Sequence, residues 1–271
     1  MSVVIEFDQV WYGYEKEKPV LQGVSLAIRQ GEFVAIIGGN GSGKTTLAKH
    51  CNGLYKPTQG MVTVNGNDTR SMPVALLSRT VAYCYQNPDH QIFHSTVKAE
   101  VSFGPKNMGL SAAEIERVVN EALEAVGLAD KGDEELYFSS KGTRQKIAVA
   151  SILAMRPQVI VLDEPTTGLD YRGVQEMMEL VRRLHEAGHT IIVISHDMRL
   201  VAEYAQRVIV MHQGRVVCDG DPQRVFAAPD ILASAQVEPP AIYRFGKAVG
   251  TFDPIPLTLA EMQKILTRVG D

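Results

Sequence analysis

Three short apolar runs stand out along this chain, and polar residues directly follow each of them. They cover residues 33–37, 159–162 and 190–194, and none shows the alternation expected of a half-buried strand. Apolar runs of this length are typical of strands buried on both faces, as in sheets covered by helices. The sequence therefore predicts an α/β fold.

Residues 3–36 follow a different pattern, in which short apolar runs alternate with turns such as those at Gly13 and Gly31. This pattern indicates an antiparallel β-layer that leads into the strand at 33–37. Residues 60–66, bounded by turn-forming residues, are predicted to add another hairpin to the same layer.

Helical spacing is clearest in the middle of the chain. Ser111 and Glu114 form a capping box ahead of apolar residues that recur at helical spacing until Gly127. Another helix is predicted from about residue 142 to residue 154, where Arg-Pro closes it.

The composition changes toward the end of the chain. Five prolines interrupt residues 229–256, after which Thr258 and Glu261 cap a final amphipathic helix. We therefore expect a main domain over residues 1–230 and a separate appendage over residues 231–271.

Residues 38–45 match the pattern G-x-x-x-x-G-K-[ST] at every fixed position, between a predicted strand and a predicted helix. The backbone N–H groups of such a P-loop and the helix dipole form a cradle for phosphates. Lys44 is expected to reach the β- and γ-phosphates, and the Thr45 hydroxyl to bind Mg²⁺. A turn without a ligand is disfavoured because pattern and context agree. The predicted nucleotide-binding residues here are Gly38, Asn40, Gly41, Ser42, Gly43, Lys44, Thr45 and Thr46.

Polar residues gather at the ends of the other two apolar runs. Asp163 and Glu164 follow residues 159–162, and His196 follows residues 190–194. Ligands of open α/β sheets collect at such carboxyl ends. We expect Asp163 to bind Mg²⁺, Glu164 to orient or deprotonate a water, and His196 to contact the γ-phosphate.

Two further residues are candidates from their positions alone. Gln86 begins a loop that Pro88 keeps irregular, so its amide could contact Mg²⁺ or the attacking water. Tyr14 lies shortly before the core begins, where it could stack on a base or serve as an ordinary strand aromatic. Spacing alone leaves both interpretations of Tyr14 open.

His90 and His94 are four residues apart, a spacing that could place two metal ligands on one helix face. No third ligand is evident in the sequence. Contacts with solvent or with a partner protein are therefore the preferred interpretation.

Charge and cysteine content narrow the function classes. A net charge of −4, from 27 basic and 31 acidic residues, gives no footprint for nucleic acid. Three widely spaced cysteines, Cys51, Cys84 and Cys218, indicate free thiols in a reducing compartment. An acidic residue near the N-terminus disfavours a signal peptide, and no apolar run is long enough to span a bilayer. We expect a cytoplasmic protein that serves a membrane only through a partner.

Over residues 1 to about 230 the chain resembles the ATP-binding subunits of ABC transporters, and within them the cobalt and energy-coupling-factor type. The matching segments are the P-loop at 38–45 as Walker A, Gln86 as the Q-loop glutamine, residues 159–163 as Walker B, Glu164 as the catalytic carboxylate, residues 168–170 as the D-loop, and His196 as the switch histidine. Tyr14 aligns with the aromatic that stacks on the base. The subtype resemblance depends on residues 86–93, on residues 153–157 and on the C-terminal extension.

The resemblance implies a P-loop NTPase fold with a RecA-like core, an antiparallel β-layer, a helical subdomain at about residues 87–156 and a small C-terminal appendage that stabilises a dimer. It implies ATP and Mg²⁺ as ligands, with Thr45, Gln86 and Asp163 near the metal. The Gln86 loop, through Ile92 and Phe93, is expected to border the groove that receives a helix of a membrane subunit.

The family signature, Leu-Ser-Gly-Gly-Gln, is degraded in this chain. Residues 139–143 occupy its place, where Ser140 and Gly142 match but Lys141 replaces a glycine and Thr143 the glutamine. The resemblance places the signature against the ATP of a partner subunit, so two copies of this chain would give two impaired sites. We therefore expect a non-identical partner with an intact signature.

The favoured function is an ATPase that powers a membrane importer of vitamins or transition-metal ions, bound at the cytoplasmic face of the membrane. The first alternative is a non-transport ABC ATPase acting on nucleic acid or ribosomes, which would need a long coiled-coil insertion or a second P-loop. The other alternative, a P-loop small-molecule kinase, does not explain Gln86, the signature remnant and the paired carboxylates together.

Overall fold

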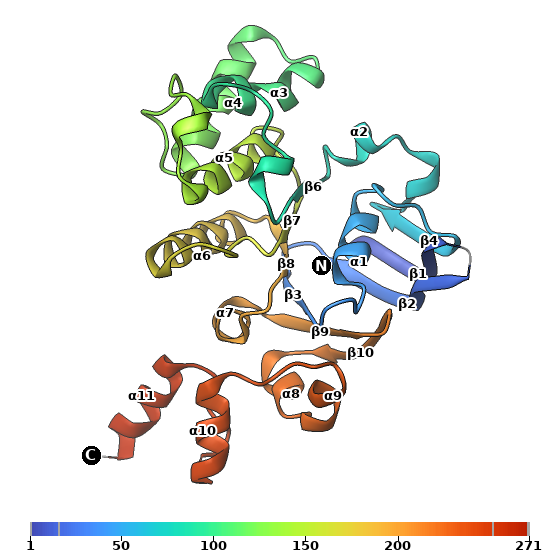
Figure 1. The fold of residues 1–271 in the computed structure, drawn as a ribbon, viewed down its shortest axis with the longest axis vertical. Coiled ribbons are helices and arrows are strands. Elements are labelled where there is room, and N and C mark those ends of the chain that lie inside the picture. The colour runs from blue at the N-terminus through green and yellow to red at the C-terminus, as the bar shows by residue number, and fades with distance from the viewer. Residues whose placement is uncertain (1, 16, 251, 270–271) are drawn as a thin grey trace.

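The computed structural model describes residues 2–15, 17–250 and 252–269. Its strands are β1 (Val3–Glu15), β2 (Lys18–Arg29), β3 (Phe33–Ile37), β4 (Gln59–Val64), β5 (Asn67–Asp68), β6 (Val81–Cys84), β7 (Val159–Asp163), β8 (Thr190–Ile194), β9 (Arg207–His212) and β10 (Arg215–Gly220). They form two sheets, and helices lie at both ends of the molecule (Figure 1).

The larger sheet has six strands in the order β10-β9-β3-β8-β7-β6. The five strands from β9 to β6 run parallel, and β10 pairs antiparallel with β9 at the edge. Every residue of β3, β7 and β8 is buried. The three apolar runs are therefore neighbouring central strands, and the predicted α/β fold is confirmed.

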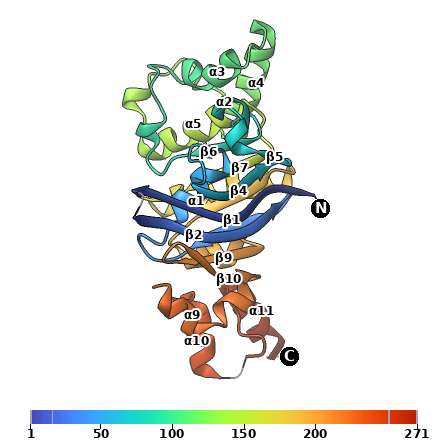
Figure 2. The ribbon, with the colours of Figure 1, turned by 90° about the vertical axis from the view of Figure 1, so that its right-hand side faces the viewer.

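The smaller sheet is antiparallel, in the order β2-β1-β4-β5. It lies across the larger sheet at mid-height of the molecule (Figure 2). The predicted antiparallel layer is confirmed, including the hairpin of residues 60–66, because β4 pairs with both β1 and β5. The turn predicted at Gly13 is wrong, because β1 continues through Gly13 to Glu15 and pairs there with β2. Residues 33–37, into which the N-terminal strands of this layer lead, form β3 of the larger sheet.

The helices are α1 (Lys44–Cys51), α2 (Val74–Leu77), α3 (Val97–Asn107), α4 (Ala112–Ala125), α5 (Lys141–Leu153), α6 (Tyr171–Glu186), α7 (Met198–Tyr204), α8 (Pro222–Phe226), α9 (Pro229–Ser234), α10 (Ala241–Val249) and α11 (Leu259–Val269). Short 3-10 turns cover Thr69–Ser71, Pro88–His90 and Leu136–Phe138. The capping box of Ser111 and Glu114 is confirmed at the start of α4. The helix predicted from about residue 142 begins one residue earlier.

The alternation of side chains along β3 divides the core in two. Val34 and Ile36 pack with Leu47 of α1 and with the antiparallel sheet. Ala35 and Ile37 face the opposite side, together with buried residues of the helices from α3 to α7. Successive side chains of a strand point to opposite faces, so one short apolar strand supports both layers.

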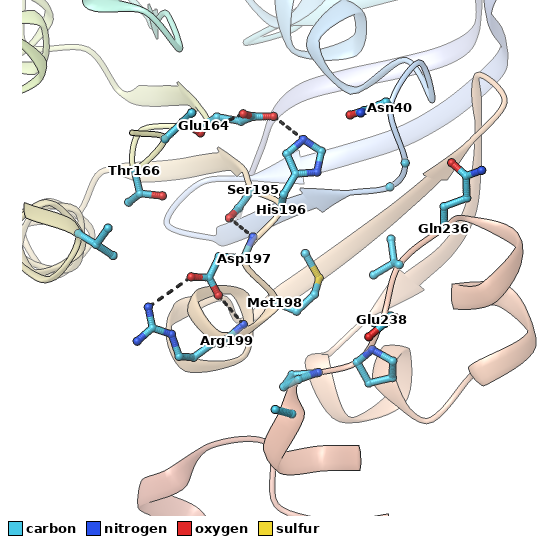
Figure 3. Close-up of a pocket in the computed structure, with 18 of the residues that line it drawn as sticks. Asn40, Glu164, Thr166, Ser195, His196, Asp197, Met198, Arg199, Gln236 and Glu238 are labelled. Atoms are coloured by element: carbon cyan, nitrogen blue, oxygen red, sulfur yellow. Dashed lines mark hydrogen bonds and ion pairs between the residues drawn. The ribbon is translucent and has the colours of Figure 1, made fainter. Parts of the chain in front are cut away.

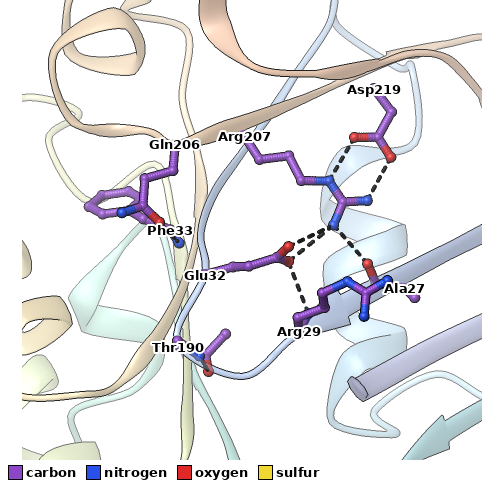
Figure 4. Close-up of polar contacts among 9 residues, drawn as sticks. Ala27, Arg29, Glu32, Phe33, Thr190, Gln206, Arg207 and Asp219 are labelled. Carbon is purple, nitrogen blue, oxygen red and sulfur yellow. Dashed lines mark hydrogen bonds and ion pairs between the residues drawn. The ribbon is translucent and has the colours of Figure 1, made fainter. Parts of the chain in front are cut away.

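Arg207 joins the edge of the larger sheet to the smaller one (Figure 4). Its guanidinium donates to both carboxylate oxygens of Asp219 on β10, at 2.7 and 2.6 Å, and to Glu32 at 3.0 Å. It also donates to the carbonyl of Ala27 on β2 at 2.8 Å. The two carboxylates raise the pKa of Arg207, which stays charged, and a planar fork with several donors suits this position better than an ammonium.

Helices α3, α4 and α5 lie at one end of the long axis, and α10 and α11 at the other (Figures 1 and 2). Leu232, Ala235, Tyr243 and Leu257 of the C-terminal segment are buried and belong to the same apolar cluster as the larger sheet. Among the described residues, no helix has both the length and the apolar character needed to cross a membrane.

Candidate functional site

The P-loop connects β3 to α1, and the chain passes through two unusual glycine conformations on the way. Gly38 has φ 146°, and a Cβ there would collide with the carbonyl oxygen of Met211 on β9. Gly43, with φ 102°, is the N-cap of α1. Only glycine occupies such conformations without strain, so the motif glycines are required by the backbone itself.

Lys44, the first residue of α1, points back into the loop and is only 6% exposed. Its ammonium donates to the carbonyl oxygens of Gly38 at 2.8 Å and Gly39 at 2.9 Å. Burial lowers the pKa of Lys44, while the nearby Glu164 and Asp163 act in the opposite direction. The hydroxyl of Ser42 is buried and has no hydrogen-bond partner among the described residues, as expected of a loop shaped for an anion.

Asp163 ends β7 directly beside α1. The hydroxyl of Tyr83 donates to its Oδ2 at 2.6 Å, and Thr45 Oγ1 donates to its Oδ1 at 3.4 Å. Burial raises the pKa of Asp163, and these hydrogen bonds oppose that shift. A carboxylate next to a threonine hydroxyl is a ligand set suited to Mg²⁺, which prefers oxygen ligands.

Glu164 is held by three side chains, two of them from other segments and one from its own loop. Gln86 Nε2 donates to its Oε2 at 2.5 Å, Thr167 donates to the same oxygen at 3.0 Å, and His196 Nε2 lies 2.5 Å from its Oε1 (Figure 3). The backbone of Glu164 has φ 49°, which is rare for a residue with a side chain. Such strain recurs at functional sites, where the surrounding structure fixes the conformation.

The strand order brings these residues together. β6, β7 and β8 are consecutive neighbours in the sheet, so the segments that follow their ends, with Gln86, Glu164 and His196, converge at one edge. The hydrogen bond of the Gln86 side chain among the described residues goes to Glu164, so its expected contact with Mg²⁺ stays a prediction. Sequence analysis missed Tyr83 and Thr167, and neither has a pattern that would have revealed it.

Tyr14 lies over the start of α1 rather than within the core. Its hydroxyl is 3.1 Å from Thr46 Oγ1, and its ring is 63% exposed. Edge contacts with Tyr12 and Tyr55, at 5.3 and 5.7 Å between centroids, orient the ring. An exposed, oriented ring beside the P-loop helix is compatible with base stacking, which stays a prediction.

Residues 139–143, named the signature segment here, lead into α5. Ser140 is the N-cap, and its Oγ accepts from the N–H of Thr143 at 3.2 Å. The side chain of Lys141 folds over Gly168 so closely that a Cβ there would lie 2.5 Å from the ammonium. Ser140 and Gly142 line a 320 Å³ cavity together with Asp170 and the α6 residues that follow it.

The metal-ligand interpretation of His90 and His94, which the sequence already disfavoured, finds no support in the structure. His90 ends a 3-10 turn, whereas His94 lies in the loop before α3, so the two do not share a helix face. Pro88 starts this 3-10 turn, which is only three residues long. His94 Nδ1 instead lies 3.0 Å from Glu100 Oε2. Among the described residues, no cluster of three potential metal ligands exists, and Cys51, Cys84 and Cys218 are free thiols, as expected.

A cavity of 810 Å³ opens beside the P-loop, and part of its lining comes from C-terminal residues that the sequence did not predict to lie there. Gly38, Asn40, Glu164 and His196 line one side. Residues from Gln236 to Ala241, assigned to the appendage, line the other side (Figure 3).

Comparison with known proteins agrees with this geometry. The family model described as ABC transporter matches residues 21–167. The energy-coupling factor transporter ATP-binding protein EcfA of Methanocaldococcus jannaschii is 38% identical over 267 residues, covering 96% of each chain. The chain therefore belongs to the ATP-binding proteins of the ABC transporter family, and its fold is that of a P-loop NTPase.

Two further similarities refine the picture. A putative ABC transporter ATP-binding protein of Caldanaerobacter subterraneus is 50% identical over 249 residues, which cover 92% of this chain but 44% of that protein. This chain thus spans less than half the length of that relative. Among solved structures, CbiO1 of Clostridium perfringens, part of the ABC transporter complex CbiONQ, matches with a TM-score of 0.78 and 35% identity, covering 86% of this chain and 94% of that one.

Proposed function

We propose that this protein is the ATP-binding and ATP-hydrolysing subunit of an energy-coupling-factor type importer for vitamins or transition-metal ions. The observation that supports the proposal best is the position of Glu164, held between His196 and Gln86 and next in sequence to the buried Asp163. The similarity to EcfA and CbiO1 supports the transporter subtype.

The site residues have distinct tasks in this proposal. Lys44 exchanges its contacts with the P-loop carbonyls for the phosphates of ATP, and Thr45 with Asp163 holds Mg²⁺. The ion, when bound, neutralises charge that develops on the transferred phosphoryl group. Glu164 orients the attacking water and accepts its proton, and His196 positions that carboxylate and contacts the γ-phosphate. Tyr14 stacks on the base.

We assign the membrane contact to the end of the helical subdomain near the Gln86 loop. Phe93 is 63% exposed and makes an edge contact with Phe103 at 4.7 Å, beside a 300 Å³ cavity. Ile92 packs partly against the core, so Phe93 is the better contact of the two. An Asp substitution at Phe93 should abolish assembly with membrane subunits but leave ATP binding intact; full assembly and transport would refute this assignment.

A non-identical second ATPase subunit is proposed as the partner. Lys141 puts a side chain where the backbone must approach a partner-held γ-phosphate, and Thr143 is shorter than the glutamine that it replaces. The P-loop face, meaning the P-loop together with Asp163, Glu164 and His196, is complete by contrast. The test places the glutamate-to-glutamine change in either subunit of the purified complex. Most activity should disappear with Glu164→Gln here; the opposite result reverses the assignment, and equal activity of this chain alone excludes the heterodimer.

The C-terminal helices are proposed to stabilise the dimer. Phe245 and Val249 of α10 and Leu259 and Leu266 of α11 are exposed apolar residues within one small unit. Purification in mild detergent, followed by identification of the attached chains, tests the whole proposal, including attachment at the cytoplasmic face of the membrane. Retrieval of ribosomes or nucleic acid in place of membrane subunits would favour the non-transport alternative.

A further inference from the structure

Residues 235–241, named the strap here, connect α9 to α10 and lie against the start of the P-loop. The N–H of Gly39 donates to the carbonyl oxygen of Ala235 at 2.8 Å. A Cβ at Gly39 would lie 2.6 Å from Gln236 Oε1 and 3.1 Å from that carbonyl oxygen. The P-loop pattern leaves position 39 free. Contact with the strap, rather than the motif, explains the glycine there.

Gln236 has an unusual backbone conformation at this contact. Its φ is 57°, in the left-handed region that non-glycine residues rarely adopt. Hydrogen bonds hold it on both sides: its own N–H donates to Ala233 O at 3.1 Å, and the N–H of Val237 donates to Leu232 O at 2.9 Å. These two bonds form a Schellman cap of α9, so the end of that helix fixes the conformation of Gln236 at the point where the strap meets the P-loop.

The strap is stiff between this contact and α10. Pro239 and Pro240 each have a fixed φ, so few soft dihedrals remain between Gln236 and the first residue of the helix. Glu238 accepts from Arg244 of α10 at 2.7 Å, and Tyr243 of the same helix is buried in the core. A shift of the P-loop at Gly39 would therefore move α10 rather than be absorbed in the connection.

The strap also borders the 810 Å³ cavity, opposite Glu164 and His196 (Figure 3). Gln236 and Glu238 are on the strap side of this cavity, and Asn40 of the P-loop is on the side of Glu164 and His196. Any group that enters the cavity next to a bound nucleotide must fit against residues of the appendage as well as the P-loop.

From these contacts we propose that the strap is a positioning element of the nucleotide site, which transmits the state of the P-loop to α10. The inference rests on the proposed function in one respect, namely that a nucleotide occupies the P-loop. The strap then makes α10, whose first turn lines the cavity through Ala241 and Arg244, responsive to nucleotide.

The first test uses the full nucleotide-free chain and hydrogen exchange of the α10 amides. Gly39→Ala should speed their exchange roughly tenfold by displacing the strap. Adding Gln236→Gly should restore slow exchange, because glycine removes the colliding side chain and accepts a positive φ. Gly132→Ala is the matched control, since a Cβ there meets nothing closer than 3.8 Å. Unchanged α10 exchange in Gly39→Ala, or no restoration, overturns the proposal.

The second test adds Mg·ADP, with its binding measured separately by calorimetry. In the wild type, bound nucleotide should change the exchange of α10 amides, and the double variant Pro239→Gly/Pro240→Gly should bind nucleotide but lose most of this response. Binding without any response in the wild type overturns the proposal. Absence of binding refutes the proposed function instead, and the nucleotide-free test then decides by itself whether the strap positions the P-loop.

Discussion

The P-loop face and the signature segment of this chain differ in how their charged side chains are held. On the P-loop face, Lys44 is bound by two carbonyl oxygens, and Glu164 by three side chains, two of them from other segments. In the signature segment, Lys141 rests on Gly168. Groups that act within one chain can be fixed before a ligand arrives, and such preorganisation is a major source of catalysis. A segment that must meet another subunit is completed only in the complex.

The largest expected effect concerns the carboxylate at the centre of the P-loop face. In the assembled complex, Glu164→Gln should lower ATP turnover by about 100-fold or more, because an amide cannot accept the proton of the attacking water. ATP binding should persist. Phosphate release and an equilibrium nucleotide titration measure the two quantities. Glu179→Gln, at a half-exposed position on α6, is the control, and wild-type turnover in Glu164→Gln would refute the role given to Glu164.

Lys44→Ala should weaken binding rather than turnover. The ammonium is buried and faces the phosphate cradle, so its loss should reduce nucleotide affinity by roughly 10- to 100-fold, the usual range for a charge-assisted hydrogen bond. Calorimetric titration of the purified chain gives this number, with Lys106→Ala on α3 as a control that keeps wild-type affinity. Retained affinity in Lys44→Ala would show that the loop backbone alone supports binding.

Restoring the family residues in the signature segment should raise the ATPase rate of the site that this segment completes. In a complex whose main site is disabled by Glu164→Gln, Lys141→Gly with Thr143→Gln should raise the residual ATPase rate by roughly tenfold, because backbone and amide donors regain access to the partner-held phosphate. A parallel complex with Lys146→Arg, a neighbouring basic position on α5, should not show this gain. No increase would mean that the substituted residues are not what limits that site.

The smallest effect is on stability. Burial raises the pKa of Asp163, so the folded chain holds its proton more tightly than the unfolded chain, and the charged form costs stability above that pKa. The free energy of unfolding of Asp163→Asn should therefore equal that of wild type near pH 7.5 or exceed it by up to about 1 kcal/mol. The difference should shrink as the pH falls through the raised pKa. Urea denaturation at several pH values measures it, and a variant that is less stable throughout contradicts the argument.

Local patterns predicted the central strands and the P-loop because each depends on adjacent residues. A parallel strand buried on both faces has to be continuously apolar, and a phosphate loop needs glycine and lysine at fixed spacing. Spacing carried no such information for His90 and His94, because a four-residue spacing is meaningful only within one helix, and the 3-10 turn that Pro88 starts ends at His90.

By itself, the sequence determined which residues stand at the ends of the central strands and that the signature segment departs from its family. Only the tertiary structure decided which of these residues meet. Strand order brings Gln86 and His196 to Glu164, and the direction of a long side chain sends Lys141 to Gly168. The contact of Ala235 with Gly39 joins residues almost 200 positions apart. Such contacts leave no periodic trace, because they arise from the path of the backbone through space and not from the neighbours of either residue.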